Sequence, residues 1–367
     1  MFRNTVRQFI QAELVPCQSR WREQHRPDVD AFTKAGALSL LLPDISEEYE
    51  GGGGTFAHEA VVLEELARAG VQFGASVQSI VAHYVVTYGT EQQKRRWLPP
   101  MARGELIGAI AMTEPSAGSD LQGIRTSAWR EGDDYIINGS KTFITNALLA
   151  GLVCLAVKTD TKATGPKGIS LICVETKDLA GYRVGKPLEK IGRNGHDTCE
   201  VFFDNVRVPA SNFLGATEGK GVFQMMNILV YERLSVAVAA IAAAEQAVTI
   251  TTQYVKDRTV AGQSLMDYQN TRTVLAKCKT EAQVGRVFLD SCIERFINNQ
   301  LDPVTAAMAK YWSTERECRI IDDCVQLHGG YGYMSEYLIA RMWVDSRVER
   351  IYAGTNEIML ELIASSL

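Results

Sequence analysis

The sequence predicts an α+β fold with three domains in the order helical, β and helical. Residues 1–107 carry apolar side chains at helical spacing, whereas residues 108–215 contain short runs rich in β-branched residues. Residues 216–367 return to helical patterns, which are now long and consecutive. Because long successive helices favour a bundle, we expect the chain to end in one.

In the N-terminal domain, apolar side chains recur at helical spacing from Phe2 to Leu14. The glycine run 51–54 requires a loop, and further helices are expected after it. They cover residues 56–69, ending at Gly70; about 76–88, ending at Gly89; and 91–96, capped by Thr90.

The middle domain is predicted from short strand patterns. Apolar runs over 152–157 and 169–174 are rich in β-branched residues, and in 199–204 Val201 and Phe203 fall on one face. Residues 135–140 predict a strand that enters a tight turn at Asn138–Gly139. Together these runs predict a β-domain.

The C-terminal domain is predicted from long helical patterns over 221–257, 265–299, 304–327 and 335–348. Asp302 and Pro303 form a favourable helix start, because aspartate accepts from free N–H groups and proline suits the first turn.

Composition argues against several classes of protein. The net charge is −5 and no long Lys/Arg run is present, so nucleic-acid binding is not expected. The N-terminus lacks the apolar core of a signal peptide. The most apolar stretch, 234–244, is too short to span a bilayer, which needs about 20 residues. We expect no stable membrane insertion and a cytoplasmic location, or the mitochondrial matrix if an import segment has been removed.

The cysteines and histidines predict no metal site. The 8 cysteines contain no C-x-x-C pair and no zinc-ligand spacing, so reduced, buried thiols are expected. His83, His196 and His328 are scattered, which favours structural roles.

One carboxylate stands out on the first C-terminal helix. Between Val222 and Ala244 the only charged residues are Glu232 and Arg233, so Glu232 is expected among apolar neighbours. Burial raises the pKa of a carboxyl group and suits it to act as a base near neutral pH. A structural pair with an arginine is the alternative that this pattern leaves open.

Three glycine-containing segments could surround a ligand. Residues 111–120 concentrate hydroxyl and backbone N–H groups, and residues 326–333 and 351–357 break helical patterns. None is a P-loop or a Rossmann fingerprint, and each alone is also typical of a turn.

Taken together, these segments resemble the acyl-CoA dehydrogenase family over essentially the whole chain, and its long-chain branch most closely. The motifs, in the family's order, are Met112-Thr113-Glu114-Pro115-x-Ala117-Gly118-Ser119-Asp120, Asn138-Gly139-x-Lys141-x-Phe143-Ile144-Thr145-Asn146, Gln326-x-x-Gly329-Gly330-x-Gly332 and Tyr352-x-Gly354-Thr355. The resemblance implies an N-terminal helical domain, a β-barrel-like middle domain and a C-terminal four-helix bundle. It also implies FAD as the cofactor, bound between the last two domains.

The resemblance implies that Glu232 is the catalytic base. Many members carry this glutamate in the late Tyr-Glu-Gly-Thr segment, where this chain has Ala353. The long-chain and isovaleryl branches place it on the long helix before an arginine, as in Glu232-Arg233. Glu232 would remove the α-proton of an acyl-CoA while FAD accepts the β-hydride, giving trans-2-enoyl-CoA.

The resemblance also assigns binding residues. FAD would be held by Met112, Thr113, Ser119, Phe143, Thr145, Arg258, Gln269, Gln326, Gly329, Gly330, Thr355 and Glu357. The substrate would contact Ser119, Arg233, Ala353 and Gly354, with the Ala353 N–H bonded to the thioester carbonyl. Arg258 and Gln269 would act across a subunit interface.

The implied assembly is a homotetramer, a dimer of dimers, that passes electrons to electron-transfer flavoprotein in fatty-acid β-oxidation. The chain departs from the family after Arg258, where Thr259-Val260-Ala261 stands in place of the usual aromatic residue. The arginine that often follows Ile363-Ala364 is absent as well.

A medium- or long-chain acyl-CoA is the expected substrate. The alternatives are a short or branched acyl-CoA, or an acyl group on a carrier protein in a biosynthetic pathway. A DNA-binding flavoprotein of the same fold would need an added basic C-terminal region, and a non-catalytic interaction protein would be expected to lose Glu232.

Overall fold

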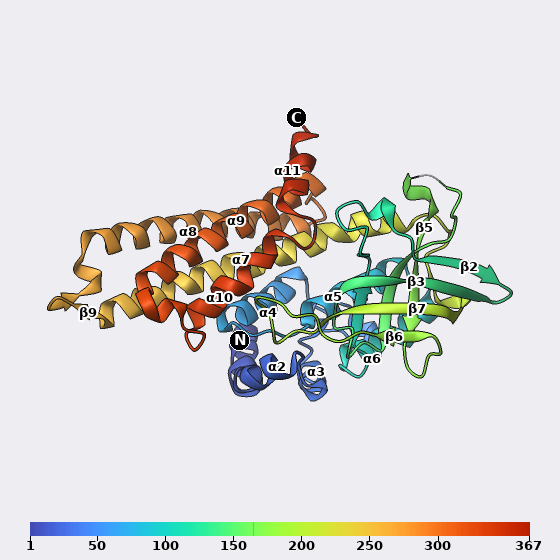
Figure 1. Cartoon of the computed structure of the whole chain (residues 1–367), viewed down its shortest axis with the longest axis horizontal. Coiled ribbons are helices and arrows are strands. Elements are labelled where there is room, and N and C mark those ends of the chain that lie inside the picture. The colour runs from blue at the N-terminus through green and yellow to red at the C-terminus, as the bar shows by residue number, and fades with distance from the viewer. Residues whose placement is uncertain (164) are drawn as a thin grey trace.

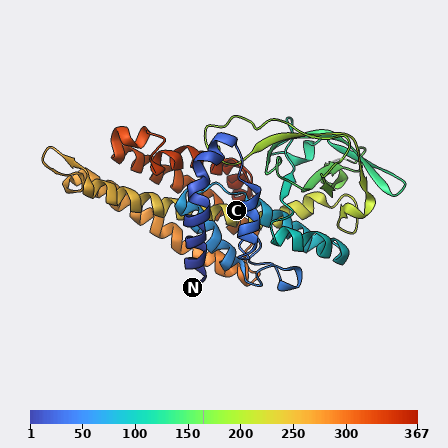
Figure 2. The same ribbon diagram turned by 90° about the horizontal axis from the view of Figure 1, so that it is seen from below.

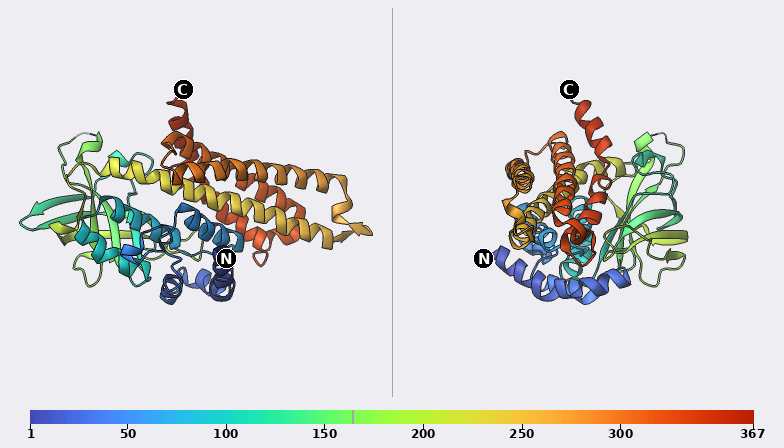
Figure 3. Two further views of the ribbon diagram at one scale, coloured as in Figure 1. Left: turned by 180° about the vertical axis from the view of Figure 1, so that it is seen from behind. Right: turned by 60° about the vertical axis from the view of Figure 1, so that its left-hand side comes forward.

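The computed structural model describes residues 1–163 and 165–367, and its elements follow the predicted order (Figure 1). The sheet lies at one end of an elongated molecule, and the long C-terminal helices extend to the other end. Figure 2 and Figure 3 show the N-terminal helices packed along one side, between these ends. The predicted α+β fold is confirmed.

The α-helices are α1 (Phe2–Phe9), α2 (Gln18–Gln24), α3 (Val29–Gly36), α4 (Phe56–Ala69), α5 (Ala75–Tyr88), α6 (Glu91–Ala102), α7 (Gly221–Asp257), α8 (Gln269–Ile297), α9 (Pro303–His328), α10 (Leu338–Ser346) and α11 (Asn356–Ala364). A π-helical turn, η1 (Ile10–Leu14), continues α1. The 3₁₀ turns are η2 (Val15–Cys17), η3 (Glu47–Tyr49), η4 (Leu121–Gly123), η5 (Gly165–Gly168), η6 (Ala210–Asn212), η7 (Leu265–Asp267), η8 (Gly329–Tyr333) and η9 (Arg347–Arg350).

The strands of the main sheet are β1 (Gly108–Ala111), β2 (Ser127–Glu131), β3 (Asp134–Thr145), β4 (Leu152–Lys158), β5 (Ile169–Glu175), β6 (Tyr182–Val184), β7 (Thr198–Pro209) and β8 (Phe213–Leu214). Their order is β6-β7-β3-β2-β4-β5-β8, and β1 pairs with β4. A small ribbon of β9 (Thr259–Val260) and β10 (Gln263–Ser264) follows α7. The long β3 pairs antiparallel with β7, which brings the segments around residues 140 and 200 side by side.

Helix ends lie where the sequence carries their signals. α4 covers the predicted residues, and Gly70 ends it with a φ of 61°. The Thr90 side chain accepts from the Gln93 N–H at the start of α6, which continues beyond the predicted end to Ala102. Asp302 accepts from the Thr305 N–H at 2.8 Å and begins α9 as expected.

The predicted tight turn at Asn138–Gly139 is wrong. Strand β3 continues through these residues, and its register with β7 shifts between Ile137 and Gly139, as in a β-bulge. The Asn138 side chain pairs with Asn205 on β7 instead of closing a hairpin. The hairpin turn lies earlier, between the paired residues Glu131 and Asp134. Pairing with two neighbouring strands has thus overridden a local turn signal.

Helix α7 is the central element of the bundle. It is long and apolar enough to cross a membrane by length and composition, unlike the 234–244 stretch considered alone, because the apolar pattern continues beyond that stretch. However, 67% of its most apolar window is buried inside the protein. Helices α4, α8 and α9 pack against it, so its apolar surface is that of a core helix.

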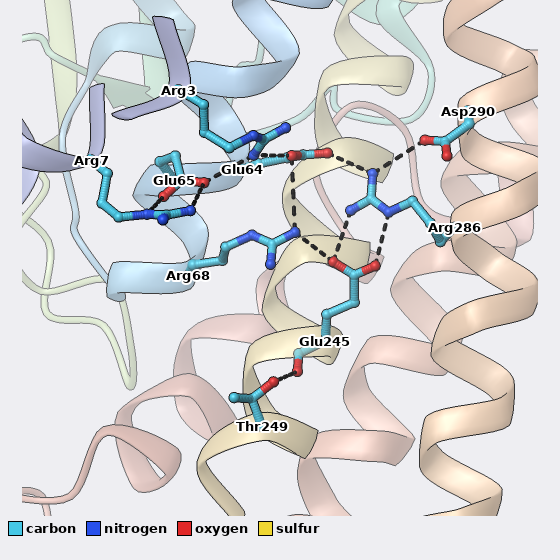
Figure 4. Close-up of polar contacts among 9 residues, drawn as sticks. All are labelled: Arg3, Arg7, Glu64, Glu65, Arg68, Glu245, Thr249, Arg286 and Asp290. Carbon is cyan, nitrogen blue, oxygen red and sulfur yellow. Dashed lines mark hydrogen bonds and ion pairs between the residues drawn. The ribbon is translucent and has the colours of Figure 1, made fainter. Parts of the chain in front are cut away.

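An ionic network fixes α7 to its neighbours (Figure 4). Arg286 on α8 donates to both carboxylate oxygens of Glu245 on α7, at 2.9 and 3.0 Å, and also pairs with Glu64 on α4. Arg3 joins α1 to Glu64, and Arg68 bridges Glu64 and Glu245. Glu64 is only 4% exposed, so the network ties the N-terminal helices to the bundle from inside.

Candidate active site

Glu232 lies within α7, where its carboxylate is almost removed from water. It is 9% exposed, and burial raises its pKa to about 7. The Tyr84 hydroxyl on α5 donates to Glu232 Oε1 at 3.4 Å, and this bond and the charge of Arg233 limit the rise in pKa. A carboxyl group with a pKa near 7 is matched to accept a proton at neutral pH.

Arg233 does not neutralise Glu232 in an ion pair. Its guanidinium is turned to another segment, where Nε donates to the Ala353 carbonyl at 3.5 Å. Across residues 1–163 and 165–367, the buried Nη1 of Arg233 has no hydrogen-bond partner. The structural Glu–Arg pair left open by the sequence is therefore not formed, and a buried guanidinium nitrogen remains available to a ligand.

Ala353 and Gly354 form the other side of this region. Both have left-handed backbone, with φ of 54° and 89°. This conformation costs about 1–2 kcal/mol for alanine, so it persists only where the surroundings impose it. Lys310 on α9 donates to the Gly354 carbonyl at 2.8 Å. Within the part of the chain that the structure describes, the Ala353 N–H has no acceptor, so the segment presents a free donor.

Hydrogen bonds from β3 hold the 112–120 loop in place. Lys141, fully buried, donates to the Met112 carbonyl and to Glu114 Oε1, both at 2.9 Å. Burial lowers the pKa of Lys141 to about 8. The Thr142 N–H donates to the Thr113 carbonyl at 2.9 Å, so Met112 and Thr113 lie beside Phe143. Ser119 is exposed in the same loop.

Phe143 combines exposure with backbone strain. It has a φ of 61° and is 66% exposed, and it lies in a second register shift of β3, between Lys141 and Ile144. Neither an exposed ring nor a left-handed phenylalanine favours folding. Thr145 follows in the same strand, half-buried. The combination indicates a surface shaped for a ligand.

The remaining predicted FAD residues form separate groups. Arg258 and Gln269 flank the β9–β10 ribbon at the end of the bundle farthest from the main sheet (Figure 1). The Arg258 guanidinium lies 5.6 Å from the ring centre of Tyr331, which follows the exposed Gly329 and Gly330. Exposed Gln326 lies in the last turn of the preceding helix, α9. An aromatic side chain is thus present beside Arg258, supplied by η8 rather than by residues 259–261.

Thr355 and Glu357 belong neither to the residues around Phe143 nor to those around Arg258. The Thr355 hydroxyl accepts from the Ile358 N–H at 3.4 Å and caps α11. Glu357 is exposed in the first turn of α11, and hydrogen bonds to its carboxylate hold its pKa below the usual value. The two residues follow the Ala353–Gly354 segment directly.

Comparison with known proteins decides the family. Family models described as the N-terminal, middle and C-terminal domains of acyl-CoA dehydrogenase match residues 1–105, 109–206 and 219–367. The chain belongs to the acyl-CoA dehydrogenase family. It is therefore a member of a family of enzymes that act on CH–CH bonds.

Named relatives of this acyl-CoA dehydrogenase include enzymes of different substrate preference. It is 45% identical to the mitochondrial long-chain specific acyl-CoA dehydrogenase of Sus scrofa, over 100% of this chain and 86% of that protein. It is 34% identical to a 3-(aryl)acrylate reductase of Clostridium sporogenes, over 100% of this chain and 97% of that protein. An acyl-CoA dehydrogenase structure from Geobacillus kaustophilus is 45% identical, with a TM-score of 0.97 over 100% and 97% of the two chains.

Members of the acyl-CoA dehydrogenase family depend on FAD. A glutaryl-CoA dehydrogenase from Mycobacterium smegmatis, 29% identical to this chain over 100% of this chain and 93% of that one with a TM-score of 0.93, was solved in complex with FADH2. The residues of this chain fit such a group. Phe143 offers an exposed ring for a flat ring system, and Arg258 offers an exposed guanidinium for a phosphate.

Sequence reasoning missed two residues of this region. Tyr84, which bonds Glu232, lies in a helix whose pattern carries no signal of this contact. Lys310 is the second: it is fully buried and also donates to Asn356 Oδ1 at 2.8 Å. The available signal was a lysine placed directly after the apolar run of residues 306–309.

Proposed function

We propose that this acyl-CoA dehydrogenase converts medium- or long-chain acyl-CoA to trans-2-enoyl-CoA in fatty-acid β-oxidation, with Glu232 as the base. The observation that carries this assignment is the buried carboxyl group of Glu232, which forms no ion pair within residues 1–163 and 165–367 and whose pKa burial raises to about 7. The 45% identity to a long-chain specific enzyme supports the preference for longer chains.

The proposed chemistry begins with proton transfer. Glu232 takes the α-proton of the thioester, and the electron pair of that C–H bond shifts toward the carbonyl. Because a thioester α-C–H is a weak acid, negative charge on the carbonyl oxygen must be stabilised. The free N–H of Ala353 is the proposed donor, and such a bond is strong in a site that excludes water. Bound FAD supplies an acceptor for the hydride that leaves the β-carbon.

Substrate contacts follow from the same neighbourhood. Arg233 has a free Nη1 beside Ala353, and we assign it to the CoA portion with Gly354 and Ser119. A guanidinium that already holds a backbone carbonyl is fixed in place, so little side-chain freedom is lost when it binds a second acceptor.

The FAD contacts divide between two subunits in this proposal. Met112, Thr113, Ser119, Phe143 and Thr145 would hold the flavin, and Thr355 and Glu357 would lie near the adenosine. Arg258, Gln269, Gln326, Gly329 and Gly330 would hold the diphosphate and adenosine of the FAD bound to the neighbouring subunit. The positions of these two groups support the division, since the β9–β10 ribbon and the main sheet lie at opposite ends of the elongated molecule (Figure 1).

A cofactor held by two chains requires at least a dimer, and we propose a homotetramer built as a dimer of dimers. Electron-transfer flavoprotein is the proposed electron acceptor, since the reduced cofactor must be reoxidised after each turnover. We propose a cytoplasmic location, or the mitochondrial matrix for a chain whose import segment has been removed. We also infer that the domains divide at about residues 107 and 215.

A second candidate is a dehydrogenase of short or branched acyl-CoA, or of an acyl group on a carrier protein. The observation behind it is the 34% identity to a 3-(aryl)acrylate reductase, over 100% of this chain and 97% of that protein. That likeness supports a compact or branched acyl group as the alternative substrate.

The test is an anaerobic titration of the purified holoenzyme. Straight-chain acyl-CoAs of increasing length, branched acyl-CoAs and carrier-bound acyl groups are added in turn, and the loss of flavin absorbance is recorded. We expect longer straight chains to bleach the flavin most completely. A flavin that no acyl-CoA bleaches would overturn the proposal, and preference for a branched or carrier-bound group would favour the second candidate.

A further inference from the structure

The segment between β6 and β7 crosses onto the C-terminal helices at Arg193. Its backbone is left-handed, with a φ of 50°, and its N–H donates to Asp345 on α10. The guanidinium forms an ion pair with Glu349 in η9. Gln72, from the connection between α4 and α5, donates to Asp345 Oδ2 at 2.6 Å and accepts from the Gly195 N–H. Segments from all three regions therefore meet at this point.

Glu349 stands at the entrance to the Ala353 segment. It is 2% exposed, and the next residues continue from its turn, since the N–H groups of Ile351 and Tyr352 both donate to the Val348 carbonyl, at 2.8 and 3.1 Å. The Arg193 guanidinium also lies 5.8 Å from the ring centre of Tyr352. Arg193 therefore contacts the segment through a charge and through a ring.

We propose that the Arg193–Glu349 ion pair fixes the left-handed backbone at Ala353, so that Arg193 and Glu349 are positioning residues for α-proton abstraction. This inference rests on the proposed role of the Ala353 N–H. The strained φ of Ala353 needs an external constraint. Arg233 and Lys310 hold the carbonyls on its far side, and the ion pair holds the chain that enters it.

A neighbouring carboxyl group provides an internal control. Glu317 on α9 is also 2% exposed, and in the described residues Oε2 of Glu317 and Oε2 of Glu349 are both buried without a partner. Two buried carboxylates beside one guanidinium cannot both be ionised at low cost. Burial raises the pKa of Glu317 well above its usual range, and the charge of Glu349 adds to this. Glu317 is therefore the neutral member, and Glu349 is the carboxyl group that lies in the ion pair with Arg193.

Because only Glu349 lies in the ion pair, Glu317→Gln and Glu349→Gln should have different effects on the Ala353 segment, although the chemical change is the same. Glu317→Gln replaces a neutral acid by a neutral amide of the same shape, so positioning is retained. Glu349→Gln and Arg193→Gln each remove one charge of the ion pair and release the segment that leads to Ala353.

The experiment measures carbonyl activation apart from hydride transfer. Holoenzyme variants are incubated in D₂O with an acyl-CoA analogue that cannot be oxidised, and α-deuterium incorporation is followed by mass spectrometry. Glu349→Gln and Arg193→Gln are expected to lower the exchange rate and kcat by about 10- to 100-fold with little change in KM, because a displaced donor loses contact with the developing charge. Glu317→Gln is expected to stay within about threefold of wild type, as replacing a neutral group by a neutral isostere costs little.

FAD content and Tm of each variant are recorded alongside. If Glu349→Gln does not fold, Arg193→Lys takes its place, since it keeps the charge but shortens the reach and should give a smaller loss of exchange. Equal losses in all three glutamine variants, or losses that simply follow Tm or FAD content, would overturn the inference. A wild-type holoenzyme that shows no exchange with any acyl-CoA analogue would overturn the proposed function itself, and the inference with it.

Discussion

The hydroxyl of Tyr84 donates to Glu232 Oε1 across 3.4 Å, although the two residues lie 148 positions apart in the chain. Tyr84 is fully buried, so this bond forms away from water. A hydrogen bond to the charged form of a carboxyl group stabilises that form and weakens it as a base. The strength of the proposed base is thus linked to one hydroxyl that mutation can remove.

Tyr84→Phe should therefore move the pH dependence of turnover. The base is active as a carboxylate, so kcat/KM of the wild type should rise as pH passes about 7. Without the hydroxyl the pKa of Glu232 is higher, and the rise should occur at higher pH, with activity at neutral pH lower by about tenfold or less. Tyr88→Phe is the control, because Tyr88 bonds the exposed Asn227 and not the base. A profile that stays in place, or moves to lower pH, would contradict this link.

Glu232→Gln should change stability as well as abolish turnover. The folded-state pKa of about 7 exceeds the ordinary value of 4.5, so this group stabilises the folded state fully below about pH 4.5 and progressively loses that contribution as pH rises through 7. Above pH 7 the buried charge costs up to about 3 kcal/mol, which the glutamine avoids. Denaturant unfolding at fixed FAD concentration should show the variant gaining stability over the wild type between pH 5 and 8. Identical pH dependence in the two proteins would remove Glu232 as a buried titrating group.

Arg286→Met should destabilise the junction shown in Figure 4. The change removes the cation that Glu64 and Glu245 share, while Glu64 keeps Arg3 and Glu245 keeps Arg68. The expected loss is therefore that of charged hydrogen bonds, about 1.5–3 kcal/mol, and stays below the about 3–5 kcal/mol of a buried charge left without any partner. Urea unfolding followed by tryptophan fluorescence measures the loss. Lys34→Gln is the matched control, because its pair with Glu13 is exposed and worth about 1 kcal/mol or less. Similar losses for both changes would show that the buried network has no special weight.

Phe143→Gly should separate folding from cofactor binding. Glycine adopts a φ of 61° without strain, and the lost ring is mostly exposed, so the stability of the FAD-free protein should change by about 1 kcal/mol or less. FAD affinity should fall by about tenfold or more, since a stacking surface is removed. Fluorescence titration with FAD measures this. Trp129→Gly, an exposed aromatic on β2 outside the proposed contacts, should leave affinity unchanged. Unchanged affinity in Phe143→Gly would exclude the ring from the flavin site.

Local patterns were sufficient to predict the longer helices, whereas the short α2, α3 and α11 were not predicted. The bounds of α4 and α7 match the prediction because apolar spacing and end signals act within a few residues of the chain. The Asn138–Gly139 turn failed for the converse reason, since two neighbouring strands hold those residues in an extended bulge. A turn signal is a preference of about 1 kcal/mol, which the pairing of a whole strand outweighs.

The sequence by itself determined that Glu232 is buried, because a helix that is apolar nearly all round must lie in a core. Only the tertiary structure decided what surrounds that carboxylate. The Tyr84–Glu232 hydrogen bond joins residues 148 positions apart in the chain. The Arg233–Ala353 bond spans 120 positions and the Arg193–Glu349 pair spans 156. Such contacts carry no periodicity along the chain, since they depend on how helices and loops pack in space, and packing is set by the fold as a whole.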